Sequence, residues 1–103
     1  MSDVPEISVE ELAADRDAYV IDVRTPGEFA EAHVPGAHLI PLDELEDRID
    51  EVPADRGIRV ICQVGGRSAR ATEFLNAAGR DATNVAGGTS AWVAAGLPTE
   101  AAR

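Results

Sequence analysis

The chain has 103 residues, of which 45% are hydrophobic and 27% are charged, and these values exclude a disordered or collagen-like chain. The length suits one compact domain, so we expect residues 1–103 to form a single domain. Nineteen acidic and nine basic residues give a formal net charge of −10, which disfavours nucleic acid and anionic membranes as partners. Because apolar runs are short and no signal-peptide pattern opens the chain, we expect no membrane helix and a cytoplasmic location.

The first part of the chain predicts two short helices around a buried strand. Residues 8–11 form a capping box that opens a helix ending at Ala14. The apolar run over residues 19–23 predicts a strand. Residues 25–28 repeat the capping box with proline at the first helical position, and the turn sequence at 33–36 requires that helix to be short.

The middle of the chain predicts a helix and a second buried strand. Leu42, Leu45 and Ile49 have the spacing of one apolar stripe on an otherwise acidic helix, which stops before Pro53. Residues 58–62 are predominantly apolar and predict a strand.

The last part of the chain completes an alternating pattern. Apolar residues at helical spacing over 71–78 predict a helix that Gly79 ends in a left-handed conformation. Residues 83–85 predict a short strand, and residues 89–95 predict the last helix. Strands that alternate with helices imply a parallel sheet with helices on both faces and with ligands beyond the carboxyl ends of the strands. Cys62, at the end of a predicted strand, lies where this architecture places chemistry.

Cys62 is the only cysteine, which excludes an internal disulfide, a redox Cys-x-x-Cys pair and a thiolate-rich zinc site. Gly65 and Gly66 allow positive φ, so the loop N–H groups and the start of the next helix can point at the sulfur. Such donors lower a cysteine pKa from about 8.5 and make the thiol nucleophilic. They also suit an anionic sulfur atom, with no metal or organic cofactor. Without the glycines and arginines, an inert buried cysteine would be the better interpretation.

Three segments carry a family resemblance. The loop Cys62-Gln63-Val64-Gly65-Gly66-Arg67 has the pattern Cys-x-x-Gly-x-Arg. Asp22-Val-Arg24, Glu28-Phe29 and His33-Val-Pro-Gly-Ala37 precede it, and Gly87-Gly-Thr-Ser-Ala-Trp92 and Gly96-Leu-Pro98 follow it. In order and spacing these segments resemble the rhodanese family of sulfurtransferases. The resemblance implies a rhodanese-like α/β fold with a central parallel sheet of about five short strands and helices on both faces.

The resemblance also implies a reaction. In that family the loop cysteine takes sulfane sulfur from thiosulfate or a persulfide, holds it as a persulfide, and releases it to an acceptor such as a thiol or cyanide. Cys62 is then the catalytic nucleophile, and the rest of the loop binds the transferred sulfur through Gln63, Val64, Gly65, Gly66 and Arg67. This interpretation requires the amides of residues 63–67 to converge on the sulfur and the cysteine side chain to be open to solvent.

Arg67 has two possible tasks within this interpretation. It either neutralises an anionic donor or pairs with a carboxylate such as Asp22 or Glu28, and we favour the pair because it would fix the loop. Val64 stands where the family often has a polar side chain, which bears on donor preference more than on the basic chemistry.

Two other functions compete with sulfur transfer. A binding module could keep the fold without catalysis, as some relatives do, although the retained cysteine, glycines and arginine of the loop favour an enzyme. Related dual-specificity phosphatases of the cell-cycle type and certain arsenate reductases use Cys-x5-Arg, a loop one residue longer that admits a tetrahedral oxyanion. The shorter loop here should crowd phosphate.

Other polar residues have simpler interpretations. His33 and His38 lack a convincing set of metal ligands, so we expect no metal site and expect His33 to hold its turn through a hydrogen bond. Arg70 either meets an anionic donor or is merely solvated. The acidic first half of the chain either keeps the protein soluble or docks a basic partner, and its charge favours a persulfide over a small dianion as the donor.

Overall fold

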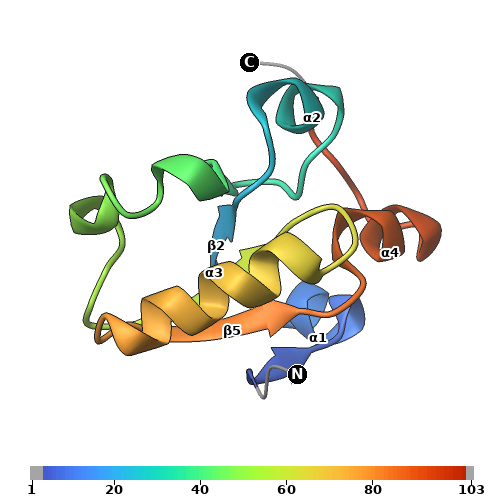
Figure 1. Cartoon of the computed structure of the whole chain (residues 1–103). Helices are drawn as coiled ribbons and strands as arrows, with labels where there is room; N and C mark the ends of the chain where they lie inside the picture. The colour runs from blue at the N-terminus through green and yellow to red at the C-terminus, as the bar shows by residue number, and fades with distance from the viewer. Residues whose placement is uncertain (1–3, 102–103) are drawn as a thin grey trace.

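The computed structural model describes residues 4–101 (Figure 1). Five parallel strands form one sheet in the order β1-β5-β4-β2-β3. The strands are β1 (Glu6–Ile7), β2 (Tyr19–Asp22), β3 (His38–Leu39), β4 (Gly57–Ile61) and β5 (Asp81–Val85). The helices are α1 (Val9–Ala14), α2 (Pro26–Glu31), α3 (Gly66–Ala77) and α4 (Gly88–Ala94), with 3-10 turns η1 (Leu42–Glu44) and η2 (Ile49–Glu51). Within this range, every helix is too short or too polar to cross a membrane.

Each face of the sheet carries its own hydrophobic core. On one face, α3 and the 3-10 turns cover Ile58 and Val60, and Leu75 of α3 is fully buried there. On the other face, α1 and α4 contribute Leu12 and Trp92 to a second core (Figure 1). The prediction of a parallel sheet of five short strands with helices on both faces is therefore confirmed.

The first two helices begin as their local sequences predict. The Glu11 N–H donates to Ser8 Oγ at 3.0 Å, and the Ser8 N–H donates to Glu11 Oε1 at 2.8 Å. Thr25 and Glu28 form the same reciprocal pair, and Pro26 occupies the first position of α2. Both predicted capping boxes are confirmed, and each satisfies N–H groups that a helix start leaves unpaired.

The sheet edges and the segment after β3 differ from the prediction. The strands β1 and β3 have two residues each, which is too short for an alternating pattern to show in the sequence. The predicted single helix over residues 42–49 is wrong, because this segment forms two separate 3-10 turns with Leu45 buried between them. The apolar spacing there indicates burial rather than a continuous helix.

An arginine from outside this segment holds its second 3-10 turn in place. Arg80 donates to the carbonyl oxygens of Val52 at 3.2 Å and Ile49 at 3.0 Å. These hydrogen bonds satisfy backbone carbonyls at the second 3-10 turn and hold it next to the end of α3.

The carboxyl edge of the sheet is where the loop with Cys62 begins. β2 and β4 pair in register, with Asp22 opposite Ile61, so the chain leaves both strands at the same edge. Cys62 is the first residue beyond β4 rather than the last residue of the strand. The loop therefore starts at the edge where parallel sheets of this kind bind ligands.

The role of Arg80 can be tested by stability. Arg80→Ala removes both hydrogen bonds, and we expect the free energy of unfolding to fall by about 1–2 kcal/mol, with a loss of about 4–8 °C in Tm for each kcal/mol. Arg70→Ala is the control, because Arg70 is an exposed arginine of α3 and its loss should change Tm little. Thermal unfolding followed by circular dichroism gives both values, and equal Tm values for the two variants would contradict this role.

Candidate active site

The Cys62 sulfur lies in a set of hydrogen-bond donors, called here the donor cup. The Gly65 N–H donates to Sγ at 3.1 Å, and Ser68 Oγ lies 3.2 Å from Sγ. Burial raises the pKa of the thiol, but the Ser68 hydroxyl and the backbone N–H groups of Ser68, Gly65 and Val64 outweigh it and lower the pKa below its ordinary value. The donor cup consists of these four groups, and it favours the nucleophilic thiolate. Of the amides of residues 63–67 that are expected to converge on the sulfur, those of Val64 and Gly65 belong to the donor cup, and its third N–H comes from Ser68, outside that range.

One of the two loop glycines supplies the required curvature. Gly65 is the N-cap of α3 and has φ 111°, a conformation that side-chain-bearing residues rarely adopt. Gly66 is the first residue of α3 and is not among the glycines with positive φ. The expectation that both glycines take positive φ is therefore correct for Gly65 only, and a Cβ at Gly66 would meet no atom within 4 Å.

The start of α4 fixes the direction of the loop peptides. Its first N–H groups donate to the carbonyl oxygens of Cys62 at 2.8 Å and Gln63 at 3.0 Å. Because the C=O and N–H of a trans peptide point in opposite directions, the Gln63 carbonyl that faces α4 turns the Val64 N–H toward the sulfur. Gly88 permits this approach, since a Cβ there would lie 2.5 Å from the Cys62 carbonyl oxygen.

The Gln63 side chain bonds to neighbouring side chains, and the Val64 side chain faces solvent. Gln63 accepts a hydrogen bond from Arg24 at 3.0 Å and donates to Ser90 Oγ at 2.8 Å. The Val64 side chain lies at the loop tip and Val64 is 69% exposed. At both positions the backbone, rather than the side chain, shapes the surroundings of Cys62.

Arg67 makes a bidentate ion pair with Glu28. Its two terminal nitrogens donate to the two carboxylate oxygens, each at 2.9 Å, and this hydrogen bonding is the main reason that the pKa of Glu28 falls to about 2. Asp22 is occupied by Arg24 at 2.8 Å in a buried pair. Of the two carboxylates considered for Arg67, the structure thus selects Glu28, and the pair joins the loop to α2.

Ser68 is the site residue that sequence reasoning missed. It is fully buried in the first turn of α3, and its hydroxyl is the one side-chain donor that lowers the pKa of Cys62. No short-range spacing rule links two residues six positions apart across a loop. The available signal was a hydroxyl residue directly after the loop arginine, in the first turn of a helix whose start points at the cysteine.

The sulfur itself is nearly covered in this conformation. Cys62 is only 1% exposed, so the expectation of a side chain open to solvent is wrong for this structure. A reactant can reach Sγ only if the groups that cover this atom move.

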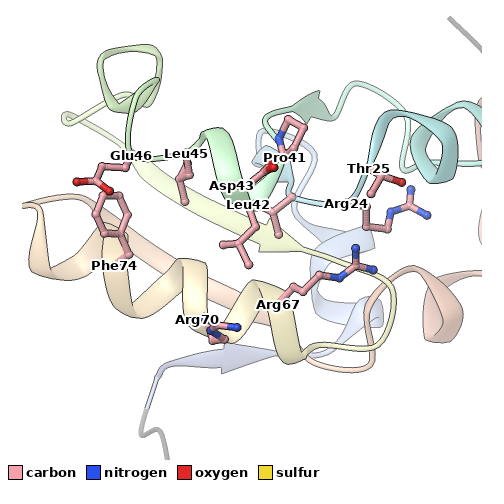
Figure 2. A pocket seen from close by; sticks show the side chains of 11 residues that line it. Arg24, Thr25, Pro41, Leu42, Asp43, Leu45, Glu46, Arg67, Arg70 and Phe74 are labelled. Carbon is pink, nitrogen blue, oxygen red and sulfur yellow. The ribbon is translucent and has the colours of Figure 1, made fainter.

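A groove lies beside the loop, between η1 and α3 (Figure 2). It has a volume of about 530 Å³, and Arg67 lies at the end next to the loop. Apolar side chains line much of its length, and Arg70 adds positive charge to the wall formed by α3. The groove leads up to the loop without including Cys62 in its wall.

The two histidines take part in aromatic contacts. His33 stacks on Phe29, and its Nδ1 lies 2.7 Å from the Phe29 carbonyl oxygen, which agrees with the expected role in holding the turn. His38 stacks on Tyr19. Within residues 4–101, no three His, Cys, Asp or Glu side chains are grouped as metal ligands would be.

The loop glycines provide a matched pair of variants. Gly65→Ala places a side chain at positive φ, and we expect a loss of about 1–2 kcal/mol in stability together with a higher thiol pKa. Gly66→Ala meets no neighbouring atom and should leave stability unchanged or raise it by about 0.5 kcal/mol. Chemical denaturation measures stability, and the pH dependence of Cys62 alkylation measures the pKa. Equal losses in the two variants would show that the curvature does not depend on Gly65.

The Glu28–Arg67 pair predicts a pH-dependent stability. The pKa of Glu28 is about 2 in the folded protein against an ordinary value of 4.5, so the pair stabilises the fold above about pH 4.5 and loses its effect as the pH falls toward 2. Glu28→Gln should lower stability by about 1 kcal/mol at pH 7 and by less at pH 3. Glu31→Gln, at the exposed end of α2, is the control. A Tm difference that stays constant between pH 7 and pH 3 would refute this assignment.

Comparison with known proteins agrees with this geometry. Residues 8–95 match the family model of the rhodanese-like domain. A sulfurtransferase from Allochromatium vinosum is 36% identical over 88 residues, which cover 84% of this chain and 82% of that protein. A putative sulfurtransferase of Bacillus subtilis, YtwF, is 33% identical over 87% of this chain and 91% of that protein. A solved rhodanese-related protein from Thermoplasma volcanium has a TM-score of 0.90 at 34% identity, and the match covers 93% of this chain and 97% of that chain. The chain therefore belongs to the family of rhodanese-like domains.

Proposed function

We propose that the protein is a rhodanese-type sulfurtransferase that carries sulfane sulfur on Cys62. The observation that carries the proposal is the donor cup, whose four groups lower the pKa of a thiol that burial alone would raise. Relatives named as sulfurtransferases align along most of their length and support the same reaction class.

Sulfur transfer through Cys62 consists of two displacements at sulfur. The thiolate attacks the outer sulfur of the donor, a new S–S bond forms, and the S–S bond of the donor breaks. Its electron pair leaves with sulfite when the donor is thiosulfate, or with a thiolate when the donor is a persulfide. A thiol or cyanide acceptor then attacks the outer sulfur, and Cys62 leaves as a thiolate. Both steps are two-electron displacements, so this chemistry requires no metal or organic cofactor.

The loop residues have separate tasks in this proposal. The N–H groups of Val64 and Gly65 act on the Cys62 sulfur, and fixed donors at this place would stabilise the negative charge on a bound sulfur atom. Gln63 and Arg67 hold the loop in shape through Arg24 and Glu28. Gly66 begins the helix whose first turn faces the same atom.

The geometry favours sulfur over phosphate as the transferred group. The donor cup converges on a single atom, Sγ, and both terminal nitrogens of Arg67 are engaged by Glu28. A transferred phosphoryl group needs donors for three oxygens arranged around it. Arg67 would have to leave Glu28 to supply them, which makes a phosphatase or arsenate reductase the weaker proposal.

Net charge narrows the class of donor. A net charge of −10 slows the approach of a small dianion such as thiosulfate. The charge therefore favours a persulfide as the donor, either of low molecular weight or on a protein. The cytoplasm suits such chemistry because a reducing compartment keeps a single cysteine free.

Mass spectrometry of the intact protein tests the proposal. Incubation with a low-molecular-weight persulfide or thiosulfate should add about 32 Da, one sulfur atom, to Cys62, and cyanide or a thiol should remove it. Cys62→Ala should show no addition. Failure of every donor to load a Cys62 that iodoacetamide still alkylates would overturn the proposal and leave a binding module. Hydrolysis of an aryl phosphate above that of Cys62→Ser would instead support a phosphatase.

A further inference from the structure

A chain of hydrogen-bonding groups connects Cys62 to the first strand of the sheet. Ser68 Oγ, 3.2 Å from the Cys62 sulfur, also lies 2.5 Å from Asn84 Oδ1. Asn84 Nδ2 in turn donates to Glu6 Oε2 at 2.9 Å. Ser68 and Asn84 are almost completely buried, so water cannot readily replace either partner. The chain runs from the loop through α3 and β5 to β1.

Two acceptors set the direction of the Asn84 amide: the Glu6 carboxylate at 2.9 Å from Nδ2 and, in a longer contact of 3.4 Å, the Gly65 carbonyl oxygen. An ionised carboxylate only accepts hydrogen bonds, so the NH2 group of Asn84 must face Glu6. The Oδ1 atom on the other side of the amide therefore faces the Ser68 hydroxyl. As long as Glu6 is in place, Asn84 is an acceptor toward Ser68 and not a donor.

Ser68 has one hydroxyl proton and three acceptors within reach. Asn84 Oδ1 lies at 2.5 Å, while the Cys62 sulfur and the Gly65 carbonyl oxygen both lie at 3.2 Å. When Cys62 is a thiol, the short contact takes the Ser68 proton. When the thiol releases its proton to solvent, Ser68 can stabilise the thiolate only by turning its own proton from Asn84 to Sγ. Two oxygen atoms then face each other without a proton between them, which costs free energy.

We propose that Glu6 and Asn84 are positioning residues that hold the Ser68 proton away from Cys62 and so restrain formation of the thiolate. Asn84 competes with the sulfur for one proton, and Glu6 keeps the competing oxygen in place. The effect on sulfur loading rests on the proposed function, because loading requires the thiolate. The effect on the ionisation of Cys62 does not depend on the proposed function.

The other charged groups near Cys62 are engaged with each other. Arg67 of α3 pairs with Glu28 of α2, and Arg24 pairs with Asp22 at the end of β2. The segment 88–94 of α4 contains no titratable side chain. Among the charged residues that the structure describes, Glu6 is the one joined to Ser68 through Asn84. A change at Glu6 therefore tests the proton competition without breaking either ion pair.

The pH dependence of Cys62 alkylation by iodoacetamide gives the test, since the chain has no second cysteine. Glutamine at position 6 can donate as well as accept, which allows the Asn84 amide to turn its NH2 toward Ser68. We expect Glu6→Gln to move the midpoint of the alkylation profile down by about 0.5–1 pH unit. Glu10→Gln removes an equal charge at an exposed position of α1 and should move the midpoint far less. Equal midpoints in these two variants would overturn the proposal.

Variants of Asn84 and Ser68 test the sign of the effect. Asn84→Ala removes the competing oxygen and should also lower the midpoint, whereas Ser68→Ala removes the donor and should raise it. When Asn84→Ala is already present, Glu6→Gln should move the midpoint of the alkylation profile no further than Glu10→Gln does. A higher midpoint in Asn84→Ala would mean that Asn84 directs Ser68 toward the sulfur, which is the opposite of the proposal. If Asn84→Ala does not fold, the comparison of the alkylation midpoints of Glu6→Gln and Glu10→Gln decides alone. Sulfur loading of the unmodified protein tests the proposed function separately.

Discussion

The arrangement of the site depends on two backbone hydrogen bonds from the start of α4 to the carbonyl oxygens of Cys62 and Gln63. They fix the orientation of the first two loop peptides, and the peptide that joins Gln63 to Val64 presents its nitrogen to the sulfur because its oxygen faces α4. The close contact is possible only because Gly88 has no side chain and has φ 61°. The glycine pair at 87–88 is thus as much a part of the Cys62 environment as the loop glycines are.

Two ion pairs hold the same loop from other elements. Arg24 and Asp22 link the end of β2 to Gln63, and Glu28 links α2 to Arg67. The three segments on which the family resemblance rests, separated along the chain, therefore meet at one loop. In the structure, residues from each of these segments help to hold the backbone donors around one sulfur atom.

The parts of the fold that sequence predicts are those with local signals. The two capping boxes, the strands that hold Ile21 and Val60, and the stop at Gly79 each follow from neighbouring residues, and the structure contains them. The strands β1 and β3 are defined by their partners across the sheet, because two residues carry no pattern of their own. The second 3-10 turn is held by Arg80, which lies about thirty residues later in the chain.

The candidate site also combines features that local sequence predicts with features that depend on tertiary packing. The loop and its cysteine follow from the sequence, because a glycine pair after a strand and before a helix has a definite geometry. The near-complete burial of Cys62 and the approach of Ser68 to its sulfur follow only from how α3 packs on the sheet. The selection of Glu28 rather than Asp22 by Arg67 also depends on that packing, since Arg24 already occupies Asp22.

A single, buried thiol would, under the proposed function, affect the lifetime of a persulfide formed on it. The chain has one cysteine, so no second thiol of this chain can discharge such a persulfide by forming an internal disulfide. Burial of Cys62 would also slow the reduction of the persulfide by small thiols in solution. Encounters with the acceptor would then set the time for which the sulfur stays bound.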